Sequence, residues 1–203
     1  MASSGMGLLN ACELSIKSLL FKEQYYRDTN QWQKLRNCYH PNPSETHIEI
    51  TWFQGDVYGF LNGSQTMASG GTGTVHTICP IKVHLMGDEA VTGSTGSISI
   101  RFSYEGQRYD CISFTRVICR LQKVDGKWNL LTSEDTYDRD SMASVLSSAQ
   151  VDFRILSGSR ESYRSIAWLL GEKGPNVKQD LPGVDDPSSC DELMDRSFRW
   201  WHE

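Results

Sequence analysis

Four strand-like runs joined by tight-turn signals are the feature that most restricts the fold of this chain. Two of the turns are plain, because Glu105-Gly106 and Asp125-Gly126 each separate two runs and such pairs favour two-residue hairpin turns. The last three runs are therefore predicted to form an antiparallel meander that bends around a core. Pro80 is expected to break or bulge the first run. The runs cover residues 75–85, 90–104, 108–124 and 128–135.

A helical pattern precedes the strands and places a carboxylate among apolar residues. The pattern runs from about residue 9 to 39 and ends at the Pro-rich turn 41–44, before a short strand predicted over residues 47–52. Asp28 is costly to bury without a partner, so it indicates either a polar pocket or the N-cap of a second short helix, with Gln31 completing a capping box. The two roles can coexist. Helical steps from Leu14 predict a core-facing stripe of Phe21, Tyr25, Asp28, Trp32 and Leu35.

Composition limits the class of protein. The chain has 203 residues, 38% of them hydrophobic, which suits one well-buried domain with an extension. The net charge of -5 argues against nucleic acids or anionic membranes as partners. No apolar stretch could span a bilayer and the N-terminus lacks the pattern of a signal peptide, so a cytoplasmic location is expected. Six scattered cysteines form no C-x-x-C pair, and no metal site is expected.

The chain is expected to have three parts. Its last part combines helical spacing over residues 159–170 with a turn-rich linker at 180–187. Ser189 and Glu192 fit a capping box, which predicts a final helix there. That helix would present one apolar side, made of Met194, Phe198 and Trp201. The three parts are a flexible N-terminus (1–8), a main domain (9–140) and a C-terminal helical extension (141–203).

One face of the run over residues 108–121 carries mostly small or weakly polar side chains. Such side chains leave room beside a sheet, which indicates the wall of a pocket. The same face is also compatible with packing against a bulky aromatic residue such as Trp32, and both interpretations stay open. The face consists of Tyr109, Cys111, Ser113, Thr115, Val117 and Cys119.

Several short motifs carry a family resemblance that covers most of the chain. They are Asp28-Thr29-Asn30-Gln31-Trp32-Gln33-Lys34-Leu35-Arg36-Asn37-Cys38, His47-Ile48-Glu49-Ile50, Thr74-Val75-His76 and Lys123-Val124-Asp125-Gly126-Lys127-Trp128. With the helices and the meander, they resemble the SnoaL-like enzymes and scytalone dehydratase of the nuclear transport factor 2-like superfamily. The resemblance implies an α+β fold, a cone-shaped curved antiparallel sheet closed by N-terminal helices. The tail, with residues 162–168 and 180–183, is similar to an extension of SnoaL-like proteins.

The resemblance also implies a site inside the cone. Asp28 matches an acid and His76 a histidine that related dehydratases use for proton transfer, and Thr115 matches a pocket-lining hydroxyl. An aspartate beside His76 would stabilise the charged imidazole and is expected to poise it near neutral pH. The positions that match the water-holding tyrosines of scytalone dehydratase are Arg27 and Ile50 here, so that specific reaction is not expected.

Our hypothesis is a cofactor-independent dehydratase, isomerase or cyclase that acts on a polyketide- or terpenoid-like intermediate of secondary metabolism. Asp28 and His76 would be its catalytic residues, and no cofactor or metal is expected. The expected partners are a hydrophobic small-molecule substrate and a second copy of the chain, which would pack through the outer face of the sheet. The hypothesised substrate-binding residues are Tyr25, Trp32, Trp52, Tyr58, Tyr109, Ser113 and Thr115.

Two rival functions share this architecture. A non-catalytic binding or assembly module would have a filled cone in which Asp28 only caps a helix. An epoxide hydrolase of the limonene type needs an Asp-Arg-Asp arrangement around a water, and Asp110 and Arg116 have the wrong parity to point into the pocket.

Overall fold

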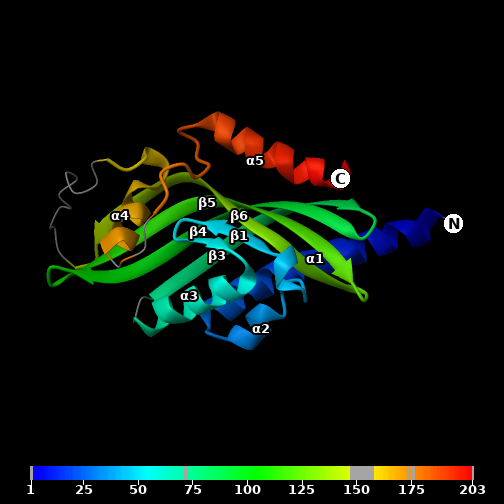
Figure 1. Ribbon diagram of the computed structural model, residues 1–203, viewed down its shortest axis with the longest axis horizontal. Coiled ribbons are helices and arrows are strands. Elements are labelled where there is room, and N and C mark those ends of the chain that lie inside the picture. Colours follow the sequence, from blue (N-terminus) through cyan, green and yellow to red (C-terminus); the bar gives the residue numbers. More distant parts are fainter. Residues whose placement is uncertain (1, 71–72, 147–157, 173, 175–176, 203) are drawn as a thin grey trace.

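A strongly curved six-stranded sheet forms the body of the molecule, with strand order β2-β1-β6-β5-β4-β3 (Figure 1). The computed structural model describes residues 2–70, 73–146, 158–172, 174 and 177–202. The strands are β1 (His47–Ile50), β2 (Phe53–Gly55), β3 (Gly73–Met86), β4 (Glu89–Tyr104), β5 (Gln107–Val124) and β6 (Lys127–Ser144). The helices are α1 (Ala2–Asp28), α2 (Trp32–Arg36), α3 (Val57–Ser69), α4 (Arg164–Glu172) and α5 (Pro187–Arg199), with 3-10 turns at Pro43–Glu45, Glu161–Tyr163 and Trp200–His202.

The predicted meander is confirmed, because β4, β5 and β6 pair antiparallel in sequence order. Both predicted hairpin turns have positive φ at their two central residues, 48° and 74° at Glu105-Gly106 and 50° and 77° at Asp125-Gly126. This is the conformation that a type I′ turn requires. The register of β3 against β4 shifts between Ile78 and Ile81, as expected from Pro80. β6 continues to Ser144, beyond the predicted end of the last run at residue 135.

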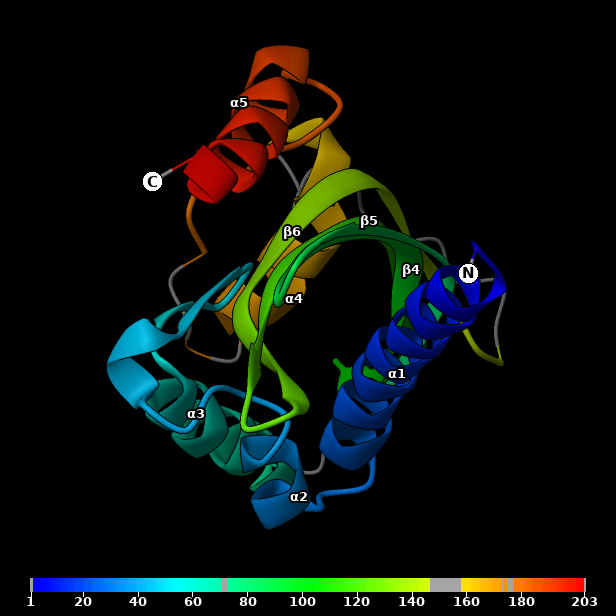
Figure 2. The same cartoon turned by 90° about the vertical axis from the view of Figure 1, so that its right-hand side faces the viewer.

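Helices α1, α2 and α3 lie on the concave side of the sheet (Figure 2). The face of α1 that packs on the sheet contains Ile16, Leu20 and Glu23, all almost fully buried. The predicted stripe from Leu14 is therefore wrong for α1, where Leu14 is 70% exposed and Tyr25 is 60% exposed. Apolar side chains occur all around this helix, so its sequence pattern does not fix which face turns inward.

The capping box predicted at Asp28 is not formed. Asp28 is the last residue of α1, and the residue preceding α2 is Gln31, whose side chain makes no capping hydrogen bond. A positive φ of 58° at Asn30 turns the chain between the two helices. The carboxylate of Asp28 is thereby free to point toward the sheet.

The C-terminal extension supplies part of the hydrophobic core. Tyr163, Ile166 and Leu169 are at most 2% exposed and pack in one cluster with Ile100 and Phe102 of β4. Figure 1 shows α4 at the end of the sheet away from the N-terminus. β6 also crosses the expected domain boundary at residue 140, and α1 begins at Ala2, where the sequence predicts a flexible segment.

A short segment of the extension, which we call the strap (residues 181–186), adds to the edge of β6. Tyr137 donates its backbone N–H to Pro182 O (2.9 Å) and accepts at its own carbonyl from Val184 N (3.0 Å). Asp185 holds the strap through an ion pair with Arg160 (2.5 Å), which together with hydrogen bonds outweighs burial and lowers the pKa of Asp185 to about 2. Gly183 is required here, because a Cβ would collide with Ser162 Oγ.

Helix α5 lies on the convex side of the sheet, opposite α1, α2 and α3 (Figure 2). Leu193 is fully buried against Val91 and Ile118, and Phe198 packs on the same cluster. The helix begins at Pro187, so the capping box predicted from Ser189 is not formed. Part of the outer sheet face is thus occupied by this chain's own helix, and the homodimer through that face stays a prediction.

No described helix combines the length and the apolar character that crossing a bilayer requires.

The packing of α4 predicts a large loss of stability when one of its core residues is truncated. Leu169→Ala removes a side chain that is 2% exposed, and we expect it to lower the free energy of unfolding by about 2–5 kcal/mol. Leu146→Ala is the matched control, because Leu146 is 85% exposed and its truncation should change stability by less than about 0.5 kcal/mol. Urea denaturation measures both. Equal effects of the two substitutions would contradict the packing described for α4.

Candidate active site

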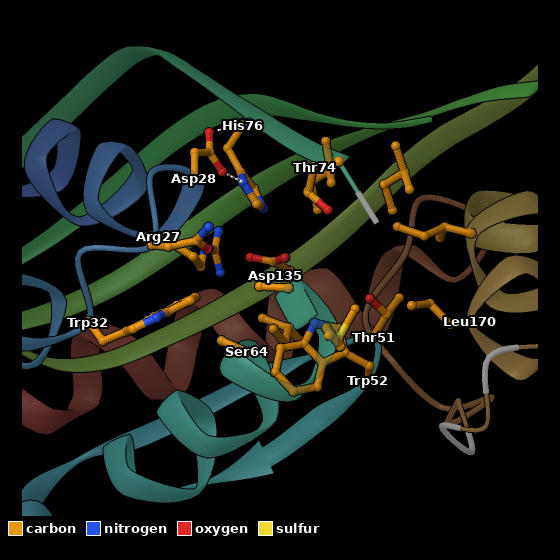
Figure 3. Close-up of a pocket in the computed structure, with 18 residues that line it drawn as sticks. Arg27, Asp28, Trp32, Thr51, Trp52, Ser64, Thr74, His76, Asp135 and Leu170 are labelled. Carbon is orange, nitrogen blue, oxygen red and sulfur yellow. Dashed lines mark hydrogen bonds and ion pairs between the residues drawn. The ribbon is translucent and has the colours of Figure 1, made fainter. Parts of the chain in front are cut away.

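A cavity of about 210 Å³ opens between the concave face of the sheet, the end of α1, α3 and α4 (Figure 3). Apolar side chains from five elements form most of its wall, and a few polar groups converge in it, as in small-molecule sites generally. It is lined by Arg27, Asp28, Asn30, Trp32, Ile50, Thr51, Trp52, Ser64, Met67, Ala68, Gly73, Thr74, His76, Ile98, Ile100, Asp135, Ile166 and Leu170.

Asp28 and His76 meet at this cavity through two hydrogen bonds. Asp28 Oδ2 accepts from the backbone N–H of His76 (2.8 Å), and Asp28 Oδ1 lies 2.5 Å from His76 Nδ1. We assign the proton to Nδ1, since the carboxylate can only accept. The imidazole then carries an unprotonated Nε2, and Figure 3 shows the ring pointing into the cavity.

His76 is held as a neutral imidazole. Burial and the nearby Arg27 guanidinium lower the pKa of His76 to about 4, although the Asp28 contact acts in the opposite direction. The expected poise near neutral pH is therefore wrong, because the burial of the ring outweighs its carboxylate partner. A neutral, oriented imidazole can accept a proton throughout the physiological pH range.

Asp135 is a second acid in the cavity, and the sequence analysis missed it. It lies in β6 opposite Val117 of β5, and burial raises its pKa to about 7, with Arg27 acting in the opposite direction. Tyr137 Oη donates to Asp135 Oδ2 (3.5 Å) and accepts from Thr51 N (2.8 Å). Asp135 ended the predicted strand, and alternation from the core residues Trp128 and Leu130 would place it on the opposite face. The register shift of β6 against β5 beside Arg120 reverses that alternation, so the sequence carries no direct signal for Asp135.

Arg27 brings a positive charge to the same place. Its Nη2 donates to Gln24 Oε1 (2.6 Å), and its guanidinium lies 5.5 Å from the centre of the Phe60 ring. Burial opposes the charge of Arg27, but the buried Glu23 and other acids outweigh it and raise the pKa of Arg27. Glu23 accepts from Tyr39 Oη (3.0 Å), and burial raises the pKa of this carboxyl group. Arg27 thus lies in a buried group of acids on the wall of the cavity.

The structure places the other predicted site residues in three settings. Trp32 and Trp52 line the cavity, and Thr115 lines a small recess of about 20 Å³ that also contacts His76 and Asp135.

The remaining predicted residues lie outside these two spaces. Tyr109 stacks on Phe102 with ring centres 5.7 Å apart, and Ser113 is fully buried in the sheet. Tyr25 and Tyr58 are 60% and 57% exposed, on the solvent sides of α1 and α3, so they do not line the cavity. The prediction that Tyr25 binds the substrate is wrong because α1 turns a different face inward than the one predicted.

A group of His47, Glu49 and Glu134 lies near the point where β1 meets β6, outside the cavity, with ligand-type atoms within 4.8 Å of one another. Its carboxylates are already paired with cations of the extension. Lys178 Nζ lies 3.1 Å from Glu49 Oε1, and Arg196 forms an ion pair with Glu134. These contacts make the group an attachment point for the C-terminal residues.

The curved sheet and the helices that cover it form a nuclear transport factor 2-like fold. Within that fold class, the model of the SnoaL-like domain matches residues 11–133, and the chain belongs to the SnoaL-like family. It is similar to a PEP2-like protein of Fusarium vanettenii, with 27% identity over 88% of this chain and 80% of that relative.

Two solved structures share the fold at low sequence identity. One is a candidate scytalone dehydratase from Novosphingobium aromaticivorans, with a TM-score of 0.54 and 18% identity over 79% of this chain and 100% of that one. The other is a type 2 hexachlorocyclohexane dehydrochlorinase, with a TM-score of 0.54 and 12% identity over 70% of this chain and 95% of that one. At these identities the likeness concerns the fold alone.

Proposed function

We propose that this protein is a cofactor-independent lyase or isomerase that removes a proton from a carbon atom beside a carbonyl group. The observation that carries the proposal is the neutral His76 imidazole, oriented by Asp28 at the wall of an apolar cavity. General-base catalysis needs this combination of an unprotonated acceptor, fixed geometry and restricted water. The dehydratase and dehydrochlorinase names of the two structural neighbours agree with elimination chemistry.

Dehydration of a β-hydroxy ketone illustrates the proposed steps. His76 Nε2 takes the proton from the carbon between the carbonyl and the hydroxyl-bearing carbon, and the electron pair moves into an enolate. Asp135, protonated below its pKa of about 7, then gives its proton to the leaving hydroxyl, which departs as water and leaves an enone. Transfer of the proton from His76 to Asp135 through solvent restores the enzyme.

The cavity size favours a compact substrate. Pockets for drug-sized ligands have volumes of about 300–1,000 Å³, whereas this cavity has about 210 Å³. Tryptophan, isoleucine and leucine side chains dominate its wall. A small polyketide- or terpenoid-like intermediate of secondary metabolism with one or two rings fits this description better than a large polycyclic one.

Proton exchange in a small ketone tests the proposal without knowledge of the natural substrate. The protein should speed the exchange of the α-protons of 2-tetralone in D₂O, followed by proton NMR. The rate should rise as pH increases through about 4, where His76 loses its proton. Binding of 2-tetralone without faster exchange would identify a binding module instead. An equal concentration of free imidazole gives the background rate.

A hydrolytic function is the second candidate. Arg27 lies in the cavity with Asp28 and Asp135, which supplies an Asp-Arg-Asp group from residues other than Asp110 and Arg116. Asp110 and Arg116 instead form surface ion pairs with Arg101 and Asp138. Both Asp28 oxygens already accept from His76, so only Asp135 could position a water, and this weakens the candidate. Conversion of cyclohexene oxide to its diol, with oxygen-18 taken from labelled water, would favour it over elimination.

A further inference from the structure

Arg27 is a half-buried cation on the cavity wall, and the hydrogen bonds of its guanidinium are incomplete. Its Nε is buried without a hydrogen-bond partner, and among the described residues Arg27 donates to Gln24 and forms no ion pair. A buried charge without a partner is costly, so such a group is retained where it contacts a ligand or a reacting atom.

The acids around Arg27 do not neutralise it by direct contact. Both oxygens of Asp28 accept hydrogen bonds from His76. Burial raises the pKa of Glu23 and raises that of Asp135 to about 7, and neither carboxyl group forms an ion pair with Arg27 among the described residues. The acids therefore act on Arg27 through its pKa without a described ion pair, and the guanidinium lies on the wall of the cavity with hydrogen-bonding capacity left over.

A second polar group on the cavity wall is also unpartnered. Ser64 Oγ, from α3, is buried and has no hydrogen-bond partner. Both residues line the cavity, and Figure 3 shows Arg27 near Asp135 and His76, with Ser64 on the α3 side. Two donor-bearing side chains that line one cavity and have unused hydrogen-bonding capacity fit a ligand with oxygen atoms.

We propose that Arg27 is the oxyanion-binding residue of the cavity, and that the substrate presents to it a carbonyl oxygen that becomes negatively charged when the proton is removed. This inference rests on the proposed function and narrows its substrate class to enolisable carbonyl compounds. Arg27 lines the same cavity as His76, and a guanidinium at that wall can stabilise the negative oxygen that forms as the proton is removed.

Binding of a small carboxylate tests the inference without turnover. Benzoate and benzamide have nearly the same shape, but only benzoate carries a charge at pH 6, about one unit below the pKa of Asp135. We expect wild-type protein to bind benzoate at least about ten-fold more tightly than benzamide, as measured by calorimetry. Equal affinities, or no binding of benzoate at 10 mM, would overturn the inference. This comparison needs no variant, so a folding defect cannot obscure it.

Substitutions at Arg27 test whether this side chain causes the preference for benzoate over benzamide. Arg27→Gln should weaken benzoate binding about ten- to hundred-fold and leave benzamide binding within about three-fold. Arg27→Lys keeps the charge and should retain most of the affinity. Arg108→Gln is the matched control, since Arg108 is exposed on β5 and its loss changes the net charge equally. Unchanged benzoate binding in folded Arg27→Gln protein would overturn the inference.

Ionisation of a bound phenol gives an independent reading, because a phenolate is a stable mimic of an enolate. At pH 6, 4-nitrophenol is mostly neutral, and its ionised form absorbs near 400 nm. Wild-type protein should increase the ionised fraction on binding, and Arg27→Gln should abolish this increase. Neither probe is turned over, so failure here leaves the role of His76 standing. Failure of 2-tetralone exchange in wild-type protein would instead overturn the proposed function and leave these titrations interpretable.

Discussion

His76→Ala is expected to reduce the exchange of 2-tetralone α-protons by about 10²–10⁴-fold, since it removes the proposed base. The fold should survive, because the hydrogen bond from the backbone N–H of His76 to Asp28 remains when the side chain is removed. His84→Ala is the matched control. His84 packs against Phe198 near α5 on the convex side and should not affect exchange. Retained exchange in His76→Ala protein would contradict the proposed mechanism.

Asp28→Asn tests the same mechanism through the pH dependence of the exchange rate. Asp28 raises the pKa of His76 against the larger effect of burial, so removal of its charge should lower that pKa further. The acid limb of the exchange profile should therefore move to below about pH 4, and the rate at pH 7 should fall about ten- to hundred-fold, because the ring loses its orientation. A fall in rate without movement of the limb would assign Asp28 a purely structural role.

Asp135→Asn is the second substitution with a large expected effect, and it should separate two steps. Exchange of 2-tetralone needs only the base and should stay within about ten-fold of wild type. Dehydration of 3-hydroxy-1-tetralone to 1-naphthol also needs an acid, and it should fall by about 100-fold or more, as measured by the absorbance of the product. Asp110→Asn, at a surface aspartate of β5, is the control. Equal losses in both assays would contradict the role of Asp135 as acid.

The same substitution should change how stability depends on pH. The pKa of Asp135 is about 7 in the folded state against a model value of 3.8, so the folded state binds the proton more tightly. Stability associated with this group is thus fully present below about pH 4 and is lost as pH rises through 7. Asp135→Asn should remove that loss and stabilise the protein by up to ~4 kcal/mol at pH 8 relative to its effect at pH 4. Thermal melts at the two pH values measure the difference.

Local signals in the sequence predicted the parts of the fold that depend on neighbouring residues. The hairpins at Glu105-Gly106 and Asp125-Gly126 need a particular backbone conformation that few residue pairs adopt, so their positions can be read directly. The inward face of α1 could not be predicted in this way, because the exposed residues Leu14 and Phe21 are as apolar as the buried Ile16. Which of these faces is buried depends on the sheet that α1 meets, which lies far away in the sequence.

The candidate site also has features that the sequence predicts and features that depend on the three-dimensional structure. The Asp28–His76 contact joins residues 48 positions apart, and the family resemblance, rather than any local pattern, pointed to it. The lowered pKa of His76 and the raised pKa of Asp135 both follow mainly from burial. Burial of a polar side chain in the middle of a strand leaves little trace in sequence periodicity. The charge states of the site therefore required the three-dimensional structure.

The strap has a consequence for engineering. It pairs with β6 at Tyr137, whose hydroxyl donates to Asp135, so residues distant in sequence help to orient the proposed acid. A chimera that joined residues 1–146 of this chain to the tail of a shorter relative would keep every polar group lining the cavity. It would nevertheless lose the backbone partner of Tyr137. Transplanting the chemistry of this cavity into another scaffold therefore requires Pro182 and Gly183 as much as His76.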